Sequence, residues 1–324
     1  MFDDRNASRN GWLNRLRSWF TDPPRPEFAC AVTSYGVAAG RWRRQRMGFE
    51  AFAARELPGT ALRPSPLVEN VLDATVFGQA LSDVLRAASA GKRGLALVVP
   101  DLAVRVFVLH FDSLPEKVED ALALLRWRLK KSLPFDVEEA LLSYQPQRNP
   151  AGGLEVILAV AQRRILRRYE ELVGALGFQA GVVLPGTLAL LPLVTDEQND
   201  GGTLVAHLNG GALTTAIVKD GVLYFYRSVE SPFEDVVVGP QAFFDELYPS
   251  LVYFQDTWGS AVRRVVLAGV EDGVAEVRRL VEREAGCSLV SLNWERWLPA
   301  RAGSAERRDI ARFGLPLLGL MVGS

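Results

Sequence analysis

The sequence is poor in the two side chains from which most redox and transition-metal sites are built. Its 324 residues include two cysteines and two histidines. Cys30 and Cys287 lie far apart without CxxC spacing, which favours two buried thiols in a reducing compartment over a redox or zinc motif. His110 and His207 stand among apolar neighbours, and neither has a second histidine at ligand spacing. The sequence therefore predicts no metal site on these side chains.

Neither sign of charge is in excess. The chain carries 37 lysines and arginines against 38 aspartates and glutamates, a net charge of −1. No overall field attracts nucleic acid, and we expect none as a partner. With 48% hydrophobic and 23% charged residues, the composition is that of a soluble globular protein. The length suits two domains or one two-lobed fold.

Long apolar runs are missing as well. No segment reaches the roughly 18 apolar residues that a membrane-spanning helix needs. The best candidates, residues 182–194 and 313–322, are short and contain proline. The first residues are polar and charged, so we expect no secretory signal. The sequence therefore predicts a soluble protein, which can still lie on a membrane surface.

Residues 10–20 (NGWLNRLRSWF) carry an apolar helical face beside two arginines, and the proline-rich residues 22–26 follow as a stiff spacer. Two interpretations stay open. The segment lies in a membrane interface, or it packs as a short helix on the body of the protein or on a partner. In the first case the membrane-contacting side chains are Trp12, Leu16, Trp19 and Phe20.

A strand–turn–strand pattern occurs twice in the chain. Residues 28–42 read as two strands around a turn at 33–36, and residues 203–218 repeat the pattern around Gly210–Gly211. Each repeat is followed by further strands and helices, which predicts two similar α/β lobes rather than one doubly wound sheet. The chain has neither GxGxxG nor GxxxxGK(S/T), so neither of these phosphate loops is present.

Helical patterns lie between and after the two repeats. The clearest covers residues 118–129, whose leucines recur at helical spacing. Asp112 or Ser113 is expected to cap this helix. A second helix is expected over residues 241–258, interrupted at Pro249.

Short motifs follow one another in a fixed order between about residue 28 and residue 322. None is specific alone, and their order carries the information. They are Arg126-Trp127 before Leu133-Pro134-Phe135, Glu138-Glu139 and Tyr144-Gln145; Val160-Ala161 before Gly177-Phe178; Thr214-Thr215 before Lys219-Asp220-Gly221; residues 251–255 before 265–269; and residues 313–322.

In this order the motifs resemble those of the actin-like superfamily and, within it, the family of the type IV pilus assembly protein PilM and the cell-division protein FtsA. The resemblance implies an α/β protein with two actin-like lobes, a duplicated ribonuclease H-like fold, and a small inserted α+β subdomain. The implied segments are residues 1–27 as an amphipathic segment and linker, 28–101 as the first lobe, 102–178 as the inserted subdomain, 179–202 as the return to the first lobe and linker, and 203–324 as the second lobe.

The resemblance also implies ATP between the lobes, cradled by two glycine-bearing turns whose aspartates hold Mg²⁺. The first turn of the family reads D-x-G-S/T, and residues 31–34 (AVTS) lack both the aspartate and the glycine. In the second turn the glycine and threonine remain, but the aspartate has become Leu208, or Asn209 in a shifted register. A third motif keeps one of its paired glycines, Gly269.

Without both carboxylates the charge of Mg²⁺ is not offset, so we predict a weak or dead cleft with no catalytic residue, metal or cofactor. ATP with Mg²⁺ would bind only if the degraded cleft still holds it. A plain tight turn and ordinary strand residues are the alternative interpretation. The residues of this vestigial ATP cleft are Thr33, Ser34, Gly36, Asn209, Gly210, Gly211, Thr214 and Gly269.

If catalysis is absent, function lies in surfaces. Trp127 lies off the apolar face of its helix, and Leu133, Pro134 and Phe135 form an apolar turn nearby. These four residues predict a groove for an extended peptide. Packing of Trp127 against the first lobe is the alternative.

The resemblance implies a cytoplasmic scaffold, peripheral at the inner membrane, in a type IV pilus or a related type II secretion assembly. Its implied partners are the N-terminal cytoplasmic peptide of a PilN-like membrane protein, other proteins of the pilus assembly platform, and the membrane surface. An active actin-like ATPase and an FtsA-like filament-forming protein stay open as alternatives. A sugar kinase would need a carboxylate near the phosphate turns, and the sequence does not reveal one.

Overall fold

The computed structural model describes residues 27–43, 47–194, 201–231, 239–270, 274–300 and 302–323. The predicted membrane-contacting side chains of residues 10–20 lie outside this part of the chain. Within it, no helix combines the length and the apolar character needed to cross a membrane.

The first lobe is built on a five-stranded sheet of order β3-β2-β1-β4-β8. Strands β1 (Phe28–Thr33), β2 (Gly36–Arg41) and β3 (Ala51–Glu56) pair antiparallel. Strands β4 (Gly94–Val99) and β8 (Gln179–Pro185) then run parallel to β1. Strand β4 is a continuous apolar run, as expected of a strand covered on both faces.

The second lobe repeats this topology in the order β11-β10-β9-β12-β13. Strands β9 (Gly202–Leu208), β10 (Ala212–Lys219) and β11 (Val222–Glu230) pair antiparallel, and β12 (Val262–Ala268) and β13 (Ser288–Ser291) run parallel to β9. The repeated strand order confirms the predicted two-lobed α/β fold.

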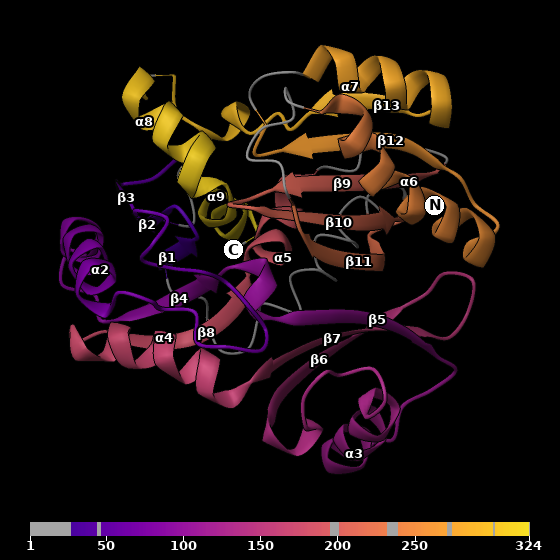
Figure 1. The fold of residues 1–324 in the computed structure, drawn as a ribbon, viewed down its shortest axis with the longest axis horizontal. Coiled ribbons are helices and arrows are strands. Elements are labelled where there is room, and N and C mark those ends of the chain that lie inside the picture. Colours follow the sequence, from indigo (N-terminus) through magenta and orange to yellow (C-terminus); the bar gives the residue numbers. More distant parts are fainter. Residues whose placement is uncertain are drawn as a thin grey trace, which may run out of the picture.

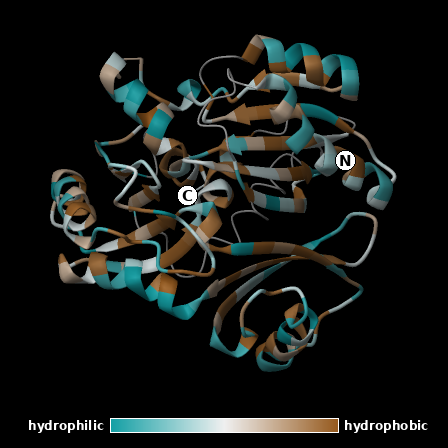
Figure 2. Cartoon of the chain, in the orientation of Figure 1, coloured by the Kyte–Doolittle hydropathy of each residue, from teal (hydrophilic) through white to brown (hydrophobic). Residues whose placement is uncertain are grey.

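Helices cover the outer faces of both sheets (Figure 1). Helices α2 (Ala74–Ser89) and α4 (Arg163–Ala175) cover the first sheet, and α6 (Pro240–Trp258) and α7 (Val274–Leu280) cover the second. In Figure 2 these helices alternate between hydrophobic and hydrophilic colours, whereas the strands are mainly hydrophobic. The resemblance implied that residues 163–175 belong to the inserted subdomain, but the buried side chains of α4 belong to the core of the first lobe.

A three-stranded antiparallel sheet of order β5-β7-β6 stands beside the two lobes. It consists of β5 (Arg105–Phe111), β6 (Ala140–Arg148) and β7 (Leu154–Gln162), with α3 (Val118–Leu129) packed on it through buried leucines. We call this unit, residues 105–162, the insert. Helix α3 begins at Val118 without a side-chain cap, so the predicted cap at residue 112 or 113 is wrong.

Helix α6 does not stop at Pro249, contrary to the sequence-based expectation. The proline removes one backbone hydrogen bond, at a cost of about 3 kcal/mol. The helix buries Phe243, Leu247 and Phe254 in the core of the second lobe. Each of these side chains contributes roughly 1.5–3 kcal/mol, so burial outweighs the break.

Two short helices form the shared core between the lobes. Helix α5 (Gly186–Leu190) follows β8, and α9 (Leu315–Val322) ends the described chain. They contact each other and both sheets within one hydrophobic cluster. A Cβ added at Gly319 of α9 would lie 2.1 Å from the carbonyl oxygen of Ala189, so only glycine allows this approach.

We predict that Gly319→Ala lowers the free energy of unfolding by about 1–3 kcal/mol, because the clash is with backbone that cannot move aside. Gly78→Ala in α2 is the matched control, since nothing lies within 4 Å of its added Cβ. This control should raise stability by roughly 0.5–1 kcal/mol through helix propensity. Equal effects in denaturant titrations would contradict the close helix contact.

Candidate functional site

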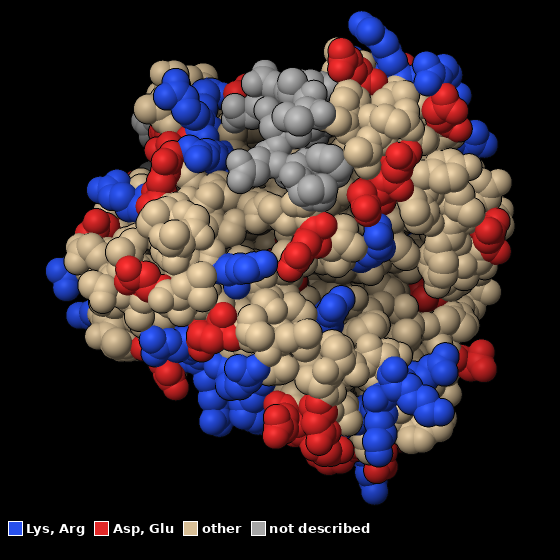
Figure 3. Space-filling view, viewed as in Figure 1, with Lys and Arg blue, Asp and Glu red and all other residues tan. Residues whose placement is uncertain are grey.

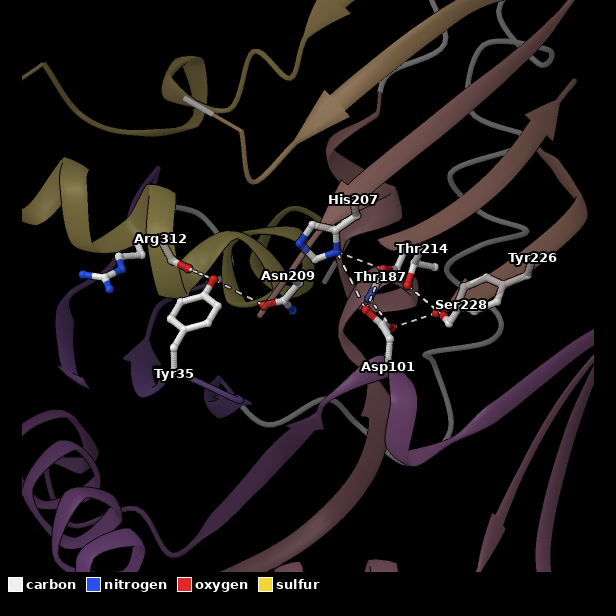
Figure 4. A network of polar contacts seen from close by, with 9 residues as sticks. All are labelled: Tyr35, Asp101, Thr187, His207, Asn209, Thr214, Tyr226, Ser228 and Arg312. Atoms are coloured by element: carbon white, nitrogen blue, oxygen red, sulfur yellow. Dashed lines mark hydrogen bonds and ion pairs between the residues drawn. The ribbon is translucent and has the colours of Figure 1, made fainter. Parts of the chain in front are cut away.

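A buried carboxylate lies where the two lobes meet (Figure 4). Asp101 follows the carboxyl end of β4, and Thr187 follows the carboxyl end of the neighbouring parallel strand β8. Parallel strands end at the same edge of a sheet, which brings these two residues of the first lobe together. His207 of β9 and Tyr226 of β11 reach the same point from the second lobe.

Three donors satisfy the Asp101 carboxylate. Its Oδ1 accepts hydrogen bonds from the Thr187 backbone N–H at 2.9 Å and from the Tyr226 hydroxyl at 2.7 Å. Its Oδ2 accepts from the Thr187 hydroxyl at 2.8 Å, and Oγ1 of Thr187 lies 2.8 Å from Nδ1 of His207. Asp101 is 2% exposed. We call these four residues the interlobe network.

Electrostatics keep the interlobe network in one protonation pattern. Burial lowers the pKa of His207, and the nearby Asp101 only partly opposes this shift. The neutral ring donates from Nδ1 to Thr187, because the Thr187 hydroxyl is itself donated to Asp101. Burial, followed by the Asp101 charge, raises the pKa of Tyr226 well above its usual range. The phenol therefore remains a donor at every physiological pH.

The two turns that correspond to the phosphate loops touch each other directly. The Ser34 hydroxyl donates to the Gly210 carbonyl at 2.6 Å. The Tyr35 hydroxyl lies 3.3 Å from Oδ1 of Asn209 and 2.8 Å from the carbonyl of Arg312. Gly210 has a φ of +59°, and a Cβ there would lie 2.2 Å from Oγ of Ser34. Only glycine therefore allows the turns to close this tightly.

The remaining cleft residues named from the sequence do not bridge the two turns. Thr33 donates its hydroxyl to the carbonyl of Gly36, and Gly36 faces the ring of Phe313. The Thr214 hydroxyl bonds to Ser228 at 2.7 Å. Gly211 and Gly269 take up positive φ values, and a Cβ at Gly269 would lie 2.1 Å from the Leu208 carbonyl. The structure thus brings the first and second turns together and leaves Thr214 inside its sheet.

Sequence reasoning missed the residues that join the lobes. A carboxylate near the phosphate turns does exist, since Asp101 directly follows the apolar strand β4. The sequence feature that could have revealed Asp101 is a charged residue at the carboxyl end of a buried strand. No local sequence feature points to Thr187 or Tyr226, and His207 was considered only as a metal ligand. Among the described residues, no group of three or more His, Cys, Asp or Glu side chains is arranged to hold a metal ion.

A second buried network joins the insert to the second lobe. The side-chain amide of Gln147 donates to the carbonyl of Leu223 at 3.1 Å and accepts from its N–H at 2.9 Å, completing the edge of β11. Buried Glu155 accepts from Asn149 and pairs with His110 at 2.8 Å. The insert therefore contacts the second lobe through satisfied polar groups.

An apolar surface stands out on the first lobe around residues 65–76. Buried Asn70 pins this loop, donating to the carbonyls of Ser65 and Val68 at 2.8 Å while its Oδ1 accepts from Tyr169. The guanidinium of Arg164 donates to the Leu67 carbonyl. The exposed aliphatic side chains of this loop surface are Leu67, Val68, Leu72 and Val76.

The four residues predicted to bind a partner peptide divide into two groups. Leu133 and Phe135 are half-buried and pack on the core of the insert, and Pro134 is exposed between them. Trp127 is 72% exposed, so it does not pack against the first lobe. Their role in peptide binding stays a prediction.

The His207 environment predicts a pH dependence of stability. Because burial lowers the pKa of His207 in the folded chain, the unfolded chain binds a proton below pH of about 6.5 that the folded chain does not. The free energy of unfolding should fall as pH drops through this range, by up to about 1.4 kcal/mol per pH unit. His207→Asn keeps a donor at the Nδ1 position and should flatten the slope in denaturant titrations. If the pH dependence of the free energy of unfolding were unchanged in this variant, His207 would not be its source.

The interlobe network also predicts the cost of losing one donor. Tyr226→Phe removes the 2.7 Å bond to Asp101 and should lower the free energy of unfolding by about 1–3 kcal/mol. Tyr253→Phe on α6 is the control, because that side chain is 51% exposed, and its effect should stay within about 0.5 kcal/mol. If thermal unfolding gave similar losses of stability for both variants, the Tyr226–Asp101 hydrogen bond would not stabilise the fold.

Neither a protein-family model nor a curated protein matches the sequence. Solved structures match through the fold. A chain of the PilM-PilN type IV pilus biogenesis complex aligns with a TM-score of 0.71 and 17% identity, covering 92% of this chain and 98% of that one. The cytoplasmic domain of EpsL, an inner-membrane component of the type II secretion system of Vibrio cholerae, aligns with a TM-score of 0.47 and 13% identity over 75% of this chain and 82% of its own.

A Bacteroides thetaiotaomicron protein with an actin-like ATPase fold and unknown function gives a TM-score of 0.49 at 11% identity, over 90% of this chain and 97% of its own. Of these three, the pilus-complex chain is the informative match, because its TM-score is well above 0.5 and the alignment covers almost all of both chains. The resemblance to the PilM family is therefore confirmed at the level of the fold, and the chain has the actin-like fold.

Proposed function

We propose that the protein is a scaffold of a type IV pilus or related secretion assembly at the inner membrane, and that it works without turning over nucleotide. The observation that carries this proposal is the direct contact between the first turn and the second, from Ser34 to Gly210 and from Tyr35 to Asn209. In an actin-like ATPase, the phosphates lie between these two turns.

Three features support a closed cleft. Triphosphate would have to break the hydrogen bond of Ser34 and displace the Tyr35 ring, whose hydroxyl also bonds to Arg312. Neither turn offers a carboxylate for Mg²⁺. The nearby carboxylate, Asp101, is already satisfied by three donors and buried, so it is available neither as a metal ligand nor as a general base.

The proposed partner is the cytoplasmic N-terminal peptide of a PilN-like membrane protein. Its support is the fold likeness to a chain of the PilM-PilN complex. The loop surface offers the docking site, because it holds Leu67, Val68, Leu72 and Val76 in water on a rigid frame. Exposed aliphatic side chains on a rigid frame lose little entropy on binding apolar side chains of a peptide.

Calorimetric titration separates the proposal from its alternatives. Mg-ATP at millimolar concentration should give no binding heat, whereas the PilN-like peptide should bind. Micromolar affinity for Mg-ATP would contradict the closed cleft and favour an active actin-like ATPase. Growth of the particle size with protein concentration in light scattering would favour an FtsA-like filament instead.

The same titration locates the peptide. Val68→Glu should weaken peptide binding by at least about ten-fold, because it places a charge in an apolar contact. Val290→Glu on β13 is the matched control, since that valine is also exposed and lies on the second lobe. If the turn around Pro134 binds the peptide, as expected from the sequence, Pro134→Glu weakens binding and Val68→Glu does not.

A further inference from the structure

The last turn of α3 and the residues after it form a cationic surface around one tryptophan. Residues 126–131 read RWRLKK, with four cations and no acidic residue. Trp127 is 72% exposed, the largest exposed fraction among the large hydrophobic side chains of the described residues. We call Arg126, Trp127, Arg128, Lys130 and Lys131 the α3 surface.

Helix geometry explains why Trp127 points outward. The helix packs on the insert through Ala121, Leu125 and Leu129. Trp127 lies two residues from each of the last two, about 200° around the helix, so it faces the opposite side. Helix α3 lies at the outer end of the insert, on the side of the sheet away from the lobes (Figure 1). The α3 surface therefore faces away from both lobes.

Within the described part of the chain, the cations of the α3 surface have no acidic partner. None of the four takes part in an ion pair or side-chain hydrogen bond with another described residue. The acidic residues of α3, Glu119 and Asp120, lie in its first turn, away from this end. Figure 3 shows basic side chains over the region that α3 occupies, with acidic side chains beside them. The charge is therefore available to an external anion.

A rigid helix that holds an indole ring in water, surrounded by four cations, fits a flat, anionic and partly apolar partner. We propose that the α3 surface docks on the anionic face of a lipid bilayer, with Trp127 at headgroup depth and the four cations on lipid phosphates. Tryptophan prefers this interfacial layer, and each lysine or arginine near an anionic leaflet adds to the attraction. The site goes beyond the scaffold function and is separate from both the cleft and the loop surface.

Co-sedimentation of the full chain with vesicles tests the site. Binding should be measured to phosphatidylcholine vesicles with and without about 30% phosphatidylglycerol, which supplies the negative surface charge of an anionic leaflet. The wild type should bind the anionic vesicles and release at high salt. The Lys130→Glu, Lys131→Glu double variant should lose at least about ten-fold in partition coefficient.

A charge-matched variant supplies the control. Arg278 and Arg279 are exposed on α7 of the second lobe, so Arg278→Glu with Arg279→Glu changes the net charge equally at another place. This control should retain most of the binding. Equal loss in both double variants, no loss in either, or equal binding to vesicles without phosphatidylglycerol would each overturn the proposal.

A second readout follows Trp127 itself. Nitroxide groups on lipid headgroups quench tryptophan fluorescence only at short range, and the quenching lost in Trp127→Phe reports this one ring among the seven tryptophans of the chain. The proposal expects a clear loss of quenching. Binding of poly-glutamate by the α3 surface, without quenching by vesicles, would overturn it in favour of an acidic protein surface.

Discussion

The structure depends on satisfying one buried carboxylate. Asp101 lies between two sheets, and a buried acceptor of this kind is costly unless donors surround it. The first lobe supplies only Thr187, and the second supplies the Tyr226 hydroxyl and, through Thr187, His207. The lobes must therefore approach closely and hold one orientation. Two glycines allow this close approach: Gly319, where α9 crosses α5, and Gly210, where the two turns touch.

This closed geometry changes what an actin-like fold can do. In such a fold, motion between lobes accompanies ligand binding only if the ligand favours one arrangement over another. Here Ser34 and Tyr35 bridge the two turns, and the insert is joined to the second lobe through Gln147 and Asn149. The lobes thus act as one rigid frame. If the protein is a scaffold, as we propose, its binding sites lie on the outside of the frame: the loop surface on the first lobe and the α3 surface on the insert.

Local patterns predicted much of this frame. The turns at 33–36 and Gly210–Gly211 and the leucine spacing of α3 each depend on near neighbours in the chain, and the duplication appeared in the repeated strand–turn–strand pattern. Strand β3 was missed because its alanines carry no strand preference. The continuity of α6 through Pro249 depends on burial in the core. The interlobe network joins residues 86 and 125 positions apart, a pairing that no local pattern contains.

A distance measured between the two lobes shows whether they are fixed relative to each other. Spin labels at Gln79→Cys on α2 and Arg278→Cys on α7 report both lobes, because these positions are exposed while the native Cys30 and Cys287 are buried. Electron–electron resonance should give one narrow distance distribution that does not change with saturating Mg-ATP. A second distance, or a shift when nucleotide is added, would contradict the rigid frame.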